Sequence, residues 1–261
     1  MLPDAVRDPV RDLTRLVLPV ACPGCGALDV PWCASCLAPL RAALRRRERA
    51  APRLDRLDGV PPLPVWAPAD YAGPVRAVVV AWKDRGRADL DGPLGRVARG
   101  AGATLRDVLL GHGPTSGGAS SQLLVVPAPT APSARRARGR DPVAGLARAV
   151  AAGLSAGTPG RTSSARPAAL LAHRGRARDQ VGLGARARGA RLAAVRLASG
   201  PGVRRALLEP LPCLLVDDVL TTGATLAACE AALTAAGMPV LGAFVLAATP
   251  APAGARTTGL P

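Results

Sequence analysis

The sequence predicts an α/β protein in which a mainly parallel sheet is flanked by helices and preceded by a small cysteine-rich module. Three short apolar runs have the composition of buried strands: residues 122–126, 212–216 and 240–246. Helical patterns lie between them, at about 141–153 and 226–236. Four closely spaced cysteines lie near the N-terminus. At 261 residues the chain is long enough for one main domain and a small appendage.

We expect three regions. Residues 1–64 form the cysteine-rich module, which begins with an amphipathic lead at 1–20 and ends in an Arg-rich helix end and a Pro-rich linker at 41–64. Residues 65–248 form the main domain. Residues 249–261 are expected to be a flexible tail.

The cysteines near the N-terminus follow the spacing C-x₂-C-x₇-C-x₂-C. They are Cys22, Cys25, Cys33 and Cys36. Each pair can form a knuckle, and four thiolates satisfy a tetrahedral Zn²⁺ ion with no position left open for catalysis. The pattern therefore predicts a structural zinc site, with redox thiols or a decayed site as the alternatives. Cys213 and Cys229 lie far from this cluster and are expected to be small buried residues.

The first helix of the main domain is expected between Pro74 and Gly86, because proline suits a first helical turn and glycine a helix end. Lys83 lies near its end and is the only lysine among 34 basic residues. Lysine and arginine differ in geometry and in how readily the pKa shifts, so a functional role and chance survival both remain open. A second helix is expected at 89–110, and a loop at 111–121.

A tight turn, Pro127–Thr130, stops the strand at 122–126, and an arginine-rich segment follows it. Asp141 and Pro142 then offer an N-cap and a first-turn proline for the next helix. Such a turn with basic residues behind it can receive a diphosphate, the alternative being a solvated basic loop. Beyond a flexible stretch at 155–168, a short strand at 169–172 leads to His173, for which a structural role is the simpler interpretation.

The most informative stretch is residues 214–226, where an apolar run ends in Asp217 and Asp218 and continues through Thr221–Thr225 into a helix. Backbone N–H groups at a helix start bind phosphate, and the threonine hydroxyls add donors. Gly223 lets the backbone approach closely. Neighbouring strand residues point to opposite faces, so we expect the strand to end at the carboxylates, which then accept hydrogen bonds from vicinal hydroxyls or hold a Mg²⁺-bound ligand. The pattern predicts a ribose 5-phosphate site, the alternative being an ordinary strand–turn–helix junction.

These thirteen residues resemble the phosphoribosyl diphosphate (PRPP) binding motif of type I phosphoribosyltransferases. Together with other stretches they resemble the ComF family, phosphoribosyltransferase-like proteins linked to competence and DNA uptake. The further matches are the four cysteines near the N-terminus, Tyr71, Gly73, Arg76 and Lys83, then Val126, Pro127, Pro129, Arg138 and Gly139, and then Gln180, Leu183 and Arg188.

The resemblance implies a type I phosphoribosyltransferase fold with an N-terminal zinc-binding module and a hood formed before residue 122. It implies transfer of phosphoribosyl from PRPP to a nitrogenous base with loss of diphosphate, with Mg²⁺ as cofactor and structural Zn²⁺. Its catalytic residues correspond to Asp217, Asp218 and Lys83, and its PRPP-binding residues to Val219, Thr221, Thr222, Gly223, Ala224, Thr225, Pro127, Ala128, Pro129 and Arg138.

Two departures from the family pattern concern the acceptor side. The family commonly has Phe-Asn-Gln where this chain has Arg140-Asp141-Pro142, and an Asn where Arg191 stands. Both changes introduce charge in a region expected to face the diphosphate or the acceptor. The acceptor base is therefore left open, as is the oligomeric state, with a homo-oligomer among the alternatives.

The formal net charge of +16 would suit a polyanionic partner, although a biased base composition would also produce it. The alternative function is therefore a non-catalytic or weakly catalytic accessory protein of DNA uptake that binds a nucleotide and single-stranded DNA. No Walker A sequence occurs, which excludes a P-loop motor. We expect a cytoplasmic protein without a signal peptide or membrane insertion, since no apolar run approaches about 20 residues.

Overall fold

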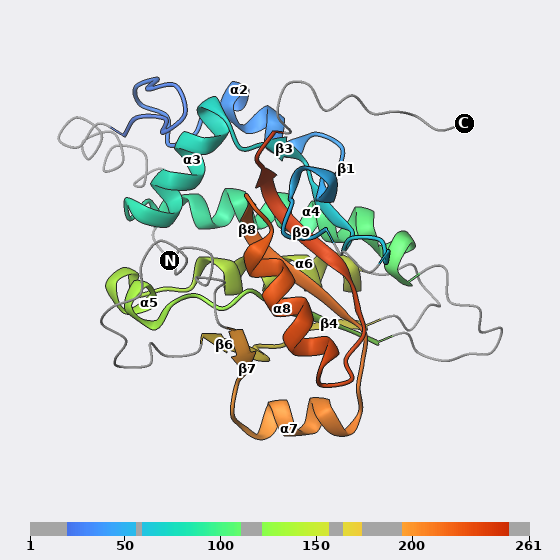
Figure 1. Ribbon diagram of the computed structural model, residues 1–261. Coiled ribbons are helices and arrows are strands. Elements are labelled where there is room, and N and C mark those ends of the chain that lie inside the picture. Colours follow the sequence, from blue (N-terminus) through green and yellow to red (C-terminus); the bar gives the residue numbers. More distant parts are fainter. Residues whose placement is uncertain (1–19, 56–58, 111–121, 157–163, 174–194, 251–261) are drawn as a thin grey trace, which may run out of the picture.

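A computed structural model describes residues 20–55, 59–110, 122–156, 164–173 and 195–250 of the chain (Figure 1). The expected amphipathic lead, apart from Val20, and the loop expected at 111–121 lie outside the described residues. So do nearly all of the expected tail and the family matches at Gln180, Leu183 and Arg188, together with Arg191.

A seven-stranded sheet forms the centre of the molecule, in the order β1-β2-β9-β8-β4-β5, with β3 also pairing with β9. All of its pairings are parallel except that of β1 with β2, which is antiparallel. A separate antiparallel pair is formed by β6 and β7. The strands are β1 Arg45–Arg46, β2 Val65–Ala67, β3 Ala69–Asp70, β4 Gln122–Pro127, β5 Ser164–Pro167, β6 Leu171–His173, β7 Val195–Leu197, β8 Cys213–Leu220 and β9 Val240–Ala248. The mostly parallel sheet predicted from the sequence is confirmed.

Helices cover both faces of this sheet (Figure 1). One face packs against α3, α4 and α6, and the other against α7 and α8. The α-helices are α2 Ala34–Leu37, α3 Gly73–Asp84, α4 Asp91–Leu110, α5 Pro132–Arg138, α6 Pro142–Ser155, α7 Pro201–Leu208 and α8 Ala224–Thr234. Short 3-10 helices are η1 Ala38–Arg41, η2 Glu48–Ala50 and η3 Ala88–Leu90.

The central strands are apolar at successive positions because both of their faces are buried. Leu123 and Val125 of β4 belong to the cluster with α3, α4 and α6, whereas Leu124 and Val126 belong to the opposite cluster. Cys213, at the start of β8, and Cys229, in α8, are fully buried in the second cluster, as expected. The core is almost entirely aliphatic, with Trp82 and Phe244 as its large aromatic members.

Helices α4 and α6 approach each other closely through two glycines. A Cβ atom added at Gly102 would lie 2.3 Å from the carbonyl oxygen of Val150, and one at Gly153 would lie 2.0 Å from that of Arg99. The guanidinium of Arg106 then donates to the carbonyls of Gly153 and Leu154 at the end of α6. These contacts hold α4 and α6 together on one face of the sheet.

Part of the segment expected to be a helix end and a linker, residues 41–64, instead joins the sheet. Arg45 and Arg46 form β1, which extends the sheet beyond β2. Buried Glu48 fixes this segment: its carboxylate pairs with Arg46 at 2.7 Å and accepts from the backbone N–H of Val65 at 3.1 Å. A run of arginines is compatible with an edge strand because the exposed side chains extend into solvent.

Several short elements have no clear sequence signal, namely β2, β3, β5, β7, α5 and α7. Strands of two to four residues are too short to show a period. Among the helices of the described residues, none combines the length and the apolar character that crossing a membrane requires.

Candidate functional site

The candidate site lies where the direction of strand addition in the sheet reverses. From β4 the chain adds β5 on one side, whereas β8, on the other side of β4, is followed by β9 still further out. In open parallel sheets such a reversal leaves a crevice at the carboxyl ends of the two strands, because the connections leave in opposite directions. The crevice here lies between the ends of β4 and β8.

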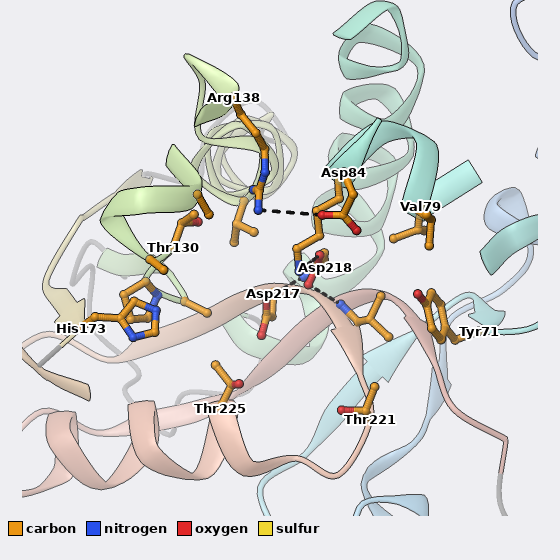
Figure 2. Close-up of a pocket in the computed structure, with 18 residues that line it drawn as sticks. Tyr71, Val79, Asp84, Thr130, Arg138, His173, Asp217, Asp218, Thr221 and Thr225 are labelled. Carbon is orange, nitrogen blue, oxygen red and sulfur yellow. Dashed lines mark hydrogen bonds and ion pairs between the residues drawn. The ribbon is translucent and has the colours of Figure 1, made fainter. Parts of the chain in front are cut away.

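A cavity of about 440 Å³ occupies this position (Figure 2). Nine of the sequence-predicted residues line it: Asp217, Asp218, Lys83, Val219, Thr221, Thr225, Ala128, Pro129 and Arg138. The cavity is lined from β8, from the start of α8, from the turn after β4 and from α3. Four predicted residues do not line it: Pro127, Thr222, Gly223 and Ala224.

The two carboxylates lie inside strand β8, which continues to Leu220, so the expectation that the strand ends at the pair is wrong. The strand continues because β9 pairs with it as far as Leu220. Adjacent residues of a strand face opposite ways, and Figure 2 shows Asp217 turned toward α8 and Asp218 turned toward α3. Both are buried, at 9% and 3% exposure.

Each carboxylate also accepts a backbone hydrogen bond. The N–H of Asp218 donates to Asp217 Oδ1 at 2.8 Å, and the N–H of Val219 donates to Asp218 Oδ1 at 2.9 Å. Burial, followed by the negative charge of Asp218, raises the pKa of Asp217 well above its usual range. The site therefore disfavours negative charge on Asp217 unless a cation approaches it.

Lys83 reaches the pair from the last turn of α3 and forms an ion pair with Asp218. Burial alone would lower the pKa of Lys83, but the charges of Asp218, Asp217 and Asp84 outweigh it and raise the pKa. Lys83 is therefore a cation held against the carboxylates. It neutralises Asp218 and leaves Asp217 without an equally direct charged partner among the described residues.

The threonine loop presents two hydroxyl side chains, Thr221 and Thr225, to the cavity at the N-terminus of α8. Thr222 turns back into the loop, where its Oγ1 accepts from the N–H of Ala224 at 3.4 Å. The carbonyl of Thr222 accepts from the N–H of Arg53 at 2.9 Å. A residue from the N-terminal region, Arg53, thus holds the backbone of this loop through a hydrogen bond.

The structure gives a reason for glycine at position 223 that the sequence did not reveal. Its φ is +82°, and a Cβ atom there would lie 2.7 Å from Cγ of Leu54 and 3.1 Å from Cβ of Ala51. The close approach is therefore to the buried segment beneath the loop, and it is additional to the approach to a ligand expected from the sequence.

The opposite wall is formed by the turn after β4 and by α5. Thr130 lines the cavity, and its hydroxyl donates to Asp141, which also caps α6 by accepting from the N–H of Ala144. The predicted N-cap at Asp141 is confirmed. Arg138, at the end of α5, reaches toward Asp84 across the cavity, with 3.9 Å between Nη2 and Oδ1 (Figure 2).

Sequence reasoning did not single out several residues of the wall. Asp84 follows Lys83 directly, and Val79 and Val80 precede it in α3. His173, at the end of β6, lies on the side of the cavity near Thr130, and Tyr71 lies on the other side (Figure 2). Tyr71 was noticed only as part of the family pattern, and His173 was assigned a structural role. Only the pairing of distant elements reveals that both line this cavity.

The cysteine-rich module brings its four thiols together. The sulfur atoms of Cys22, Cys25, Cys33 and Cys36 lie within 4.8 Å of one another. Cys33 Sγ lies 3.7 Å from Cys22 Sγ and 3.6 Å from Cys25 Sγ. A tetrahedral zinc with Zn–S bonds of about 2.3 Å requires sulfur atoms roughly 3.8 Å apart. The spacing therefore fits a four-thiolate zinc site.

The environments of two of the four thiols shift the thiol pKa in opposite directions. Burial raises the pKa of Cys22, but backbone N–H groups of Cys33, Cys25 and Gly24 outweigh it and lower the pKa to about 6. Burial, followed by the neighbouring cysteines, raises the pKa of Cys36. All six cysteines of the chain lie in described residues and are free thiols.

The cysteine cluster contacts both ends of α3. A Cβ atom at Gly24 would lie 2.6 Å from Cys36 Sγ and 3.2 Å from Cβ of Pro74, in the first turn of the helix. Beyond the other end, Arg87 donates to the carbonyls of Ala21 at 3.0 Å and Pro31 at 2.8 Å. The helix that carries Lys83 is therefore fastened at both ends to the module.

A scan against protein-family models gives no match for this chain, and a search of curated proteins gives none either. The geometry of the cavity and of the cysteine cluster is what points to a function.

Proposed function

We propose that the chain is a phosphoribosyltransferase-like protein that binds PRPP with Mg²⁺ and transfers phosphoribosyl to a nitrogenous base with loss of diphosphate. One observation carries the proposal. A buried carboxylate pair, a helix N-terminus with two threonines, and two cations surround a single cavity at the strand-order reversal. Separate groups for phosphate, for hydroxyls and for a second anionic group match the parts of PRPP.

The 5-phosphate of PRPP would bind at Thr221 and Thr225, where N–H groups and the positive end of the α8 dipole favour an anion. The ribose hydroxyls would donate to Asp217. The diphosphate would lie toward the Ala128–Thr130 turn, within reach of Lys83 and Arg138. In this assignment one end of the cavity binds the 5-phosphate and the other end binds the diphosphate.

The residues present fit Mg²⁺, which prefers carboxylate and phosphate oxygens and keeps several waters. Asp217 is a buried carboxylate whose pKa is raised by burial and by Asp218, so a nearby cation would favour its charged form. Asp217 and Asp218 are the residues that would hold the ion together with the ligand. When bound, Mg²⁺ would partly neutralise the diphosphate.

Catalysis would come from positioning and electrostatics rather than from a protein nucleophile. As diphosphate leaves, C1 of the ribose gains positive character and the departing oxygens gain negative charge. Lys83 and Arg138 would stabilise the departing group, for which Lys83 would exchange Asp218 for the diphosphate. Tyr71 and His173 stand on opposite sides of the cavity and are two polar groups that could contact an acceptor (Figure 2).

The four cysteines would bind structural Zn²⁺. A closed four-thiolate site has no open position and performs no catalysis. Because the zinc site would lie against α3, it would stabilise the position of the helix that forms one wall of the cavity.

The first experiment is diphosphate release from PRPP with Mg²⁺ and each common nucleobase as acceptor. We expect base-dependent release by the wild type and its loss in Asp217→Asn/Asp218→Asn. Glu209→Gln serves as a control, because Glu209 is an exposed carboxylate at the end of α7 that does not line the cavity. PRPP binding measured by calorimetry in parallel separates a binding defect from a catalytic one. Absence of PRPP binding by the wild type would exclude the proposal.

A second candidate is an accessory protein that binds a nucleotide and single-stranded DNA without rapid turnover. The formal net charge of +16 favours it, because a basic chain attracts a polyanion. PRPP binding without release for any base would support this candidate over a transferase.

A further inference from the structure

Arg140 does not line the candidate cavity, although the sequence suggested that it faces the diphosphate or the acceptor. It turns instead toward Trp82, in the last turn of α3. One arm of its guanidinium reaches Oδ1 of Asp91 at 2.5 Å, and the other donates to the backbone carbonyl of Trp82. Its Cζ lies 5.8 Å from the centre of the Trp82 ring.

Trp82 and Asp91 are themselves joined. The indole N–H of Trp82 donates to the same Asp91 oxygen at 2.6 Å. Trp82 is 1% exposed, the Arg140 side chain is 19% exposed and the Asp91 side chain is 49% exposed, so two of the three groups are mostly buried and Asp91 lies at the surface. We call Trp82, Asp91 and Arg140 the Trp82 cluster.

The Trp82 cluster links the elements that carry the two cations of the cavity. Trp82 immediately precedes Lys83 in α3, and Asp91 begins α4. Arg140 stands two residues after Arg138, in the turn between α5 and α6. One cluster therefore fixes the backbone next to Lys83 and next to Arg138.

The direct contact between Arg138 and Asp84 across the cavity is too weak to provide this order. The two side chains are 3.9 Å apart, which is beyond hydrogen-bond distance, and the Asp84 side chain is 57% exposed. Lys83 is held by its ion pair with Asp218 of β8, which does not set its distance from Arg138. The planar guanidinium of arginine can donate hydrogen bonds to a carboxylate and a carbonyl at the same time. The ammonium of lysine cannot do so in the same geometry.

We propose that Arg140 is a positioning residue that sets the separation of Lys83 and Arg138 and so determines the affinity for the diphosphate end of the ligand. This inference rests on the proposed function. The 5-phosphate end would be held from the other side, by Thr221 in the loop after β8 and by Thr225 in α8, and neither residue belongs to the Trp82 cluster. Loss of Arg140 therefore affects one end of the ligand only.

The test compares two ligands by calorimetry, PRPP with Mg²⁺ and ribose 5-phosphate, which lacks the diphosphate. In Arg140→Met we expect affinity for PRPP to fall about tenfold or more, because small displacements of binding groups are costly. Affinity for ribose 5-phosphate should stay within about twofold of wild type. Arg140→Lys should give an intermediate loss for PRPP.

Arg148→Met is the matched control, because Arg148 lines the neighbouring cavity beside Arg140 and, among the described residues, makes no ion pair to α3 or α4. If Arg140→Met fails to fold, Asp91→Asn weakens the same cluster with a nearly isosteric change. An equal loss for both ligands, or no loss for PRPP, would overturn the positioning role. Failure of the wild type to bind either ligand would overturn the proposed function itself and, with it, this inference.

Discussion

Asp217 is a carboxylate in a place where the fold disfavours negative charge. It is 9% exposed, and burial and then the charge of Asp218 raise its pKa well above the usual range. Functional sites commonly retain such destabilising groups, and replacing them stabilises the protein. We predict that Asp217→Asn raises the free energy of unfolding by about 1 kcal/mol near pH 8 and abolishes Mg²⁺-dependent PRPP binding.

The sign of this effect follows from proton binding. Because the folded-state pKa lies above the unfolded-state value of about 3.9, the folded protein binds more protons between the two values. Stability of the wild type therefore falls as pH rises through that interval, and the gain from asparagine grows over the same interval. Urea unfolding at pH 4 and pH 8 measures it. A gain that is the same at both pH values would contradict the assigned cause.

Gly223 is a second residue that we expect to affect both the stability of the fold and ligand binding. Its φ of +82° strains any L side chain, and a Cβ atom would contact Leu54 at 2.7 Å. We predict that Gly223→Ala lowers the free energy of unfolding by about 2 kcal/mol or more and weakens phosphate binding, because the loop must shift away from Leu54. Chemical unfolding and calorimetry with ribose 5-phosphate measure the two effects.

Gly237 provides the matched control, with φ +75° and open space around the missing Cβ atom. Gly237→Ala should cost only the backbone strain, about 1–2 kcal/mol, and leave phosphate binding unchanged. The double substitution Gly223→Ala/Leu54→Ala should recover part of the lost phosphate affinity. Equal stability and equal binding for the two single variants would show that the contact with Leu54 has no role.

Among the elements, α3 depends on the cysteine-rich module for its position. The module contacts Pro74 in the first turn and receives hydrogen bonds from Arg87 just beyond the last. We predict one zinc per chain, and that chelation lowers the free energy of unfolding by about 3 kcal/mol, the stabilisation that a ligand bound at about a hundred times its dissociation constant provides. Elemental analysis and thermal unfolding measure these effects.

Hydrogen exchange locates the consequence of zinc removal. Protection of α3 amides should fall more than that of α6, which packs on α4 through Gly102 and Gly153. Arg87→Met should reproduce a smaller loss of protection in α3 while zinc stays bound. Unchanged α3 exchange in the metal-free protein would contradict the link between module and helix.

The sequence predicted those elements whose signal is local. The strand, turn and helix from 214 to 226 form one continuous stretch, so the apolar run, the carboxylates and the helix start are all visible in it. The cysteine spacing likewise contains the cluster. The edge strand at Arg45–Arg46 was missed because its pairing with Trp66–Ala67 leaves no trace in so short a segment.

The site residues differ in the same way: some have a local sequence signal, and the positions of others depend on contacts between distant segments. Lys83 was noticeable as the only lysine, but its ion pair with Asp218 joins residues far apart in the chain. Arg140 was expected near the ligand because of its place in the sequence, and only the packing of α3 against the α5–α6 turn directs it to Trp82. Side-chain direction in loops depends on such tertiary contacts and not on local pattern.

At the scale of the whole molecule, the basic charge is spread over many elements. The formal net charge is +16, and exposed arginines lie on β1, α4, α5 and α7, for example at Arg45, Arg96, Arg135 and Arg204. The cavity, in contrast, balances two cations against buried carboxylates. A dispersed positive charge attracts any polyanion without a defined site, and salt screens that attraction.

We predict that single-stranded DNA binds the chain independently of the cavity. A plot of the logarithm of its affinity against the logarithm of the salt concentration should have a slope of about −3, the value for four or five neutralised phosphates. Asp217→Asn, which abolishes PRPP binding, should leave this slope and the DNA affinity unchanged, because Asp217 is buried at the cavity floor. Fluorescence anisotropy with a labelled oligonucleotide, titrated with PRPP and Mg²⁺, provides the measurement. Displacement of the DNA by PRPP, at concentrations where inorganic diphosphate with Mg²⁺ has no effect, would contradict the prediction and would place the strand in the cavity itself.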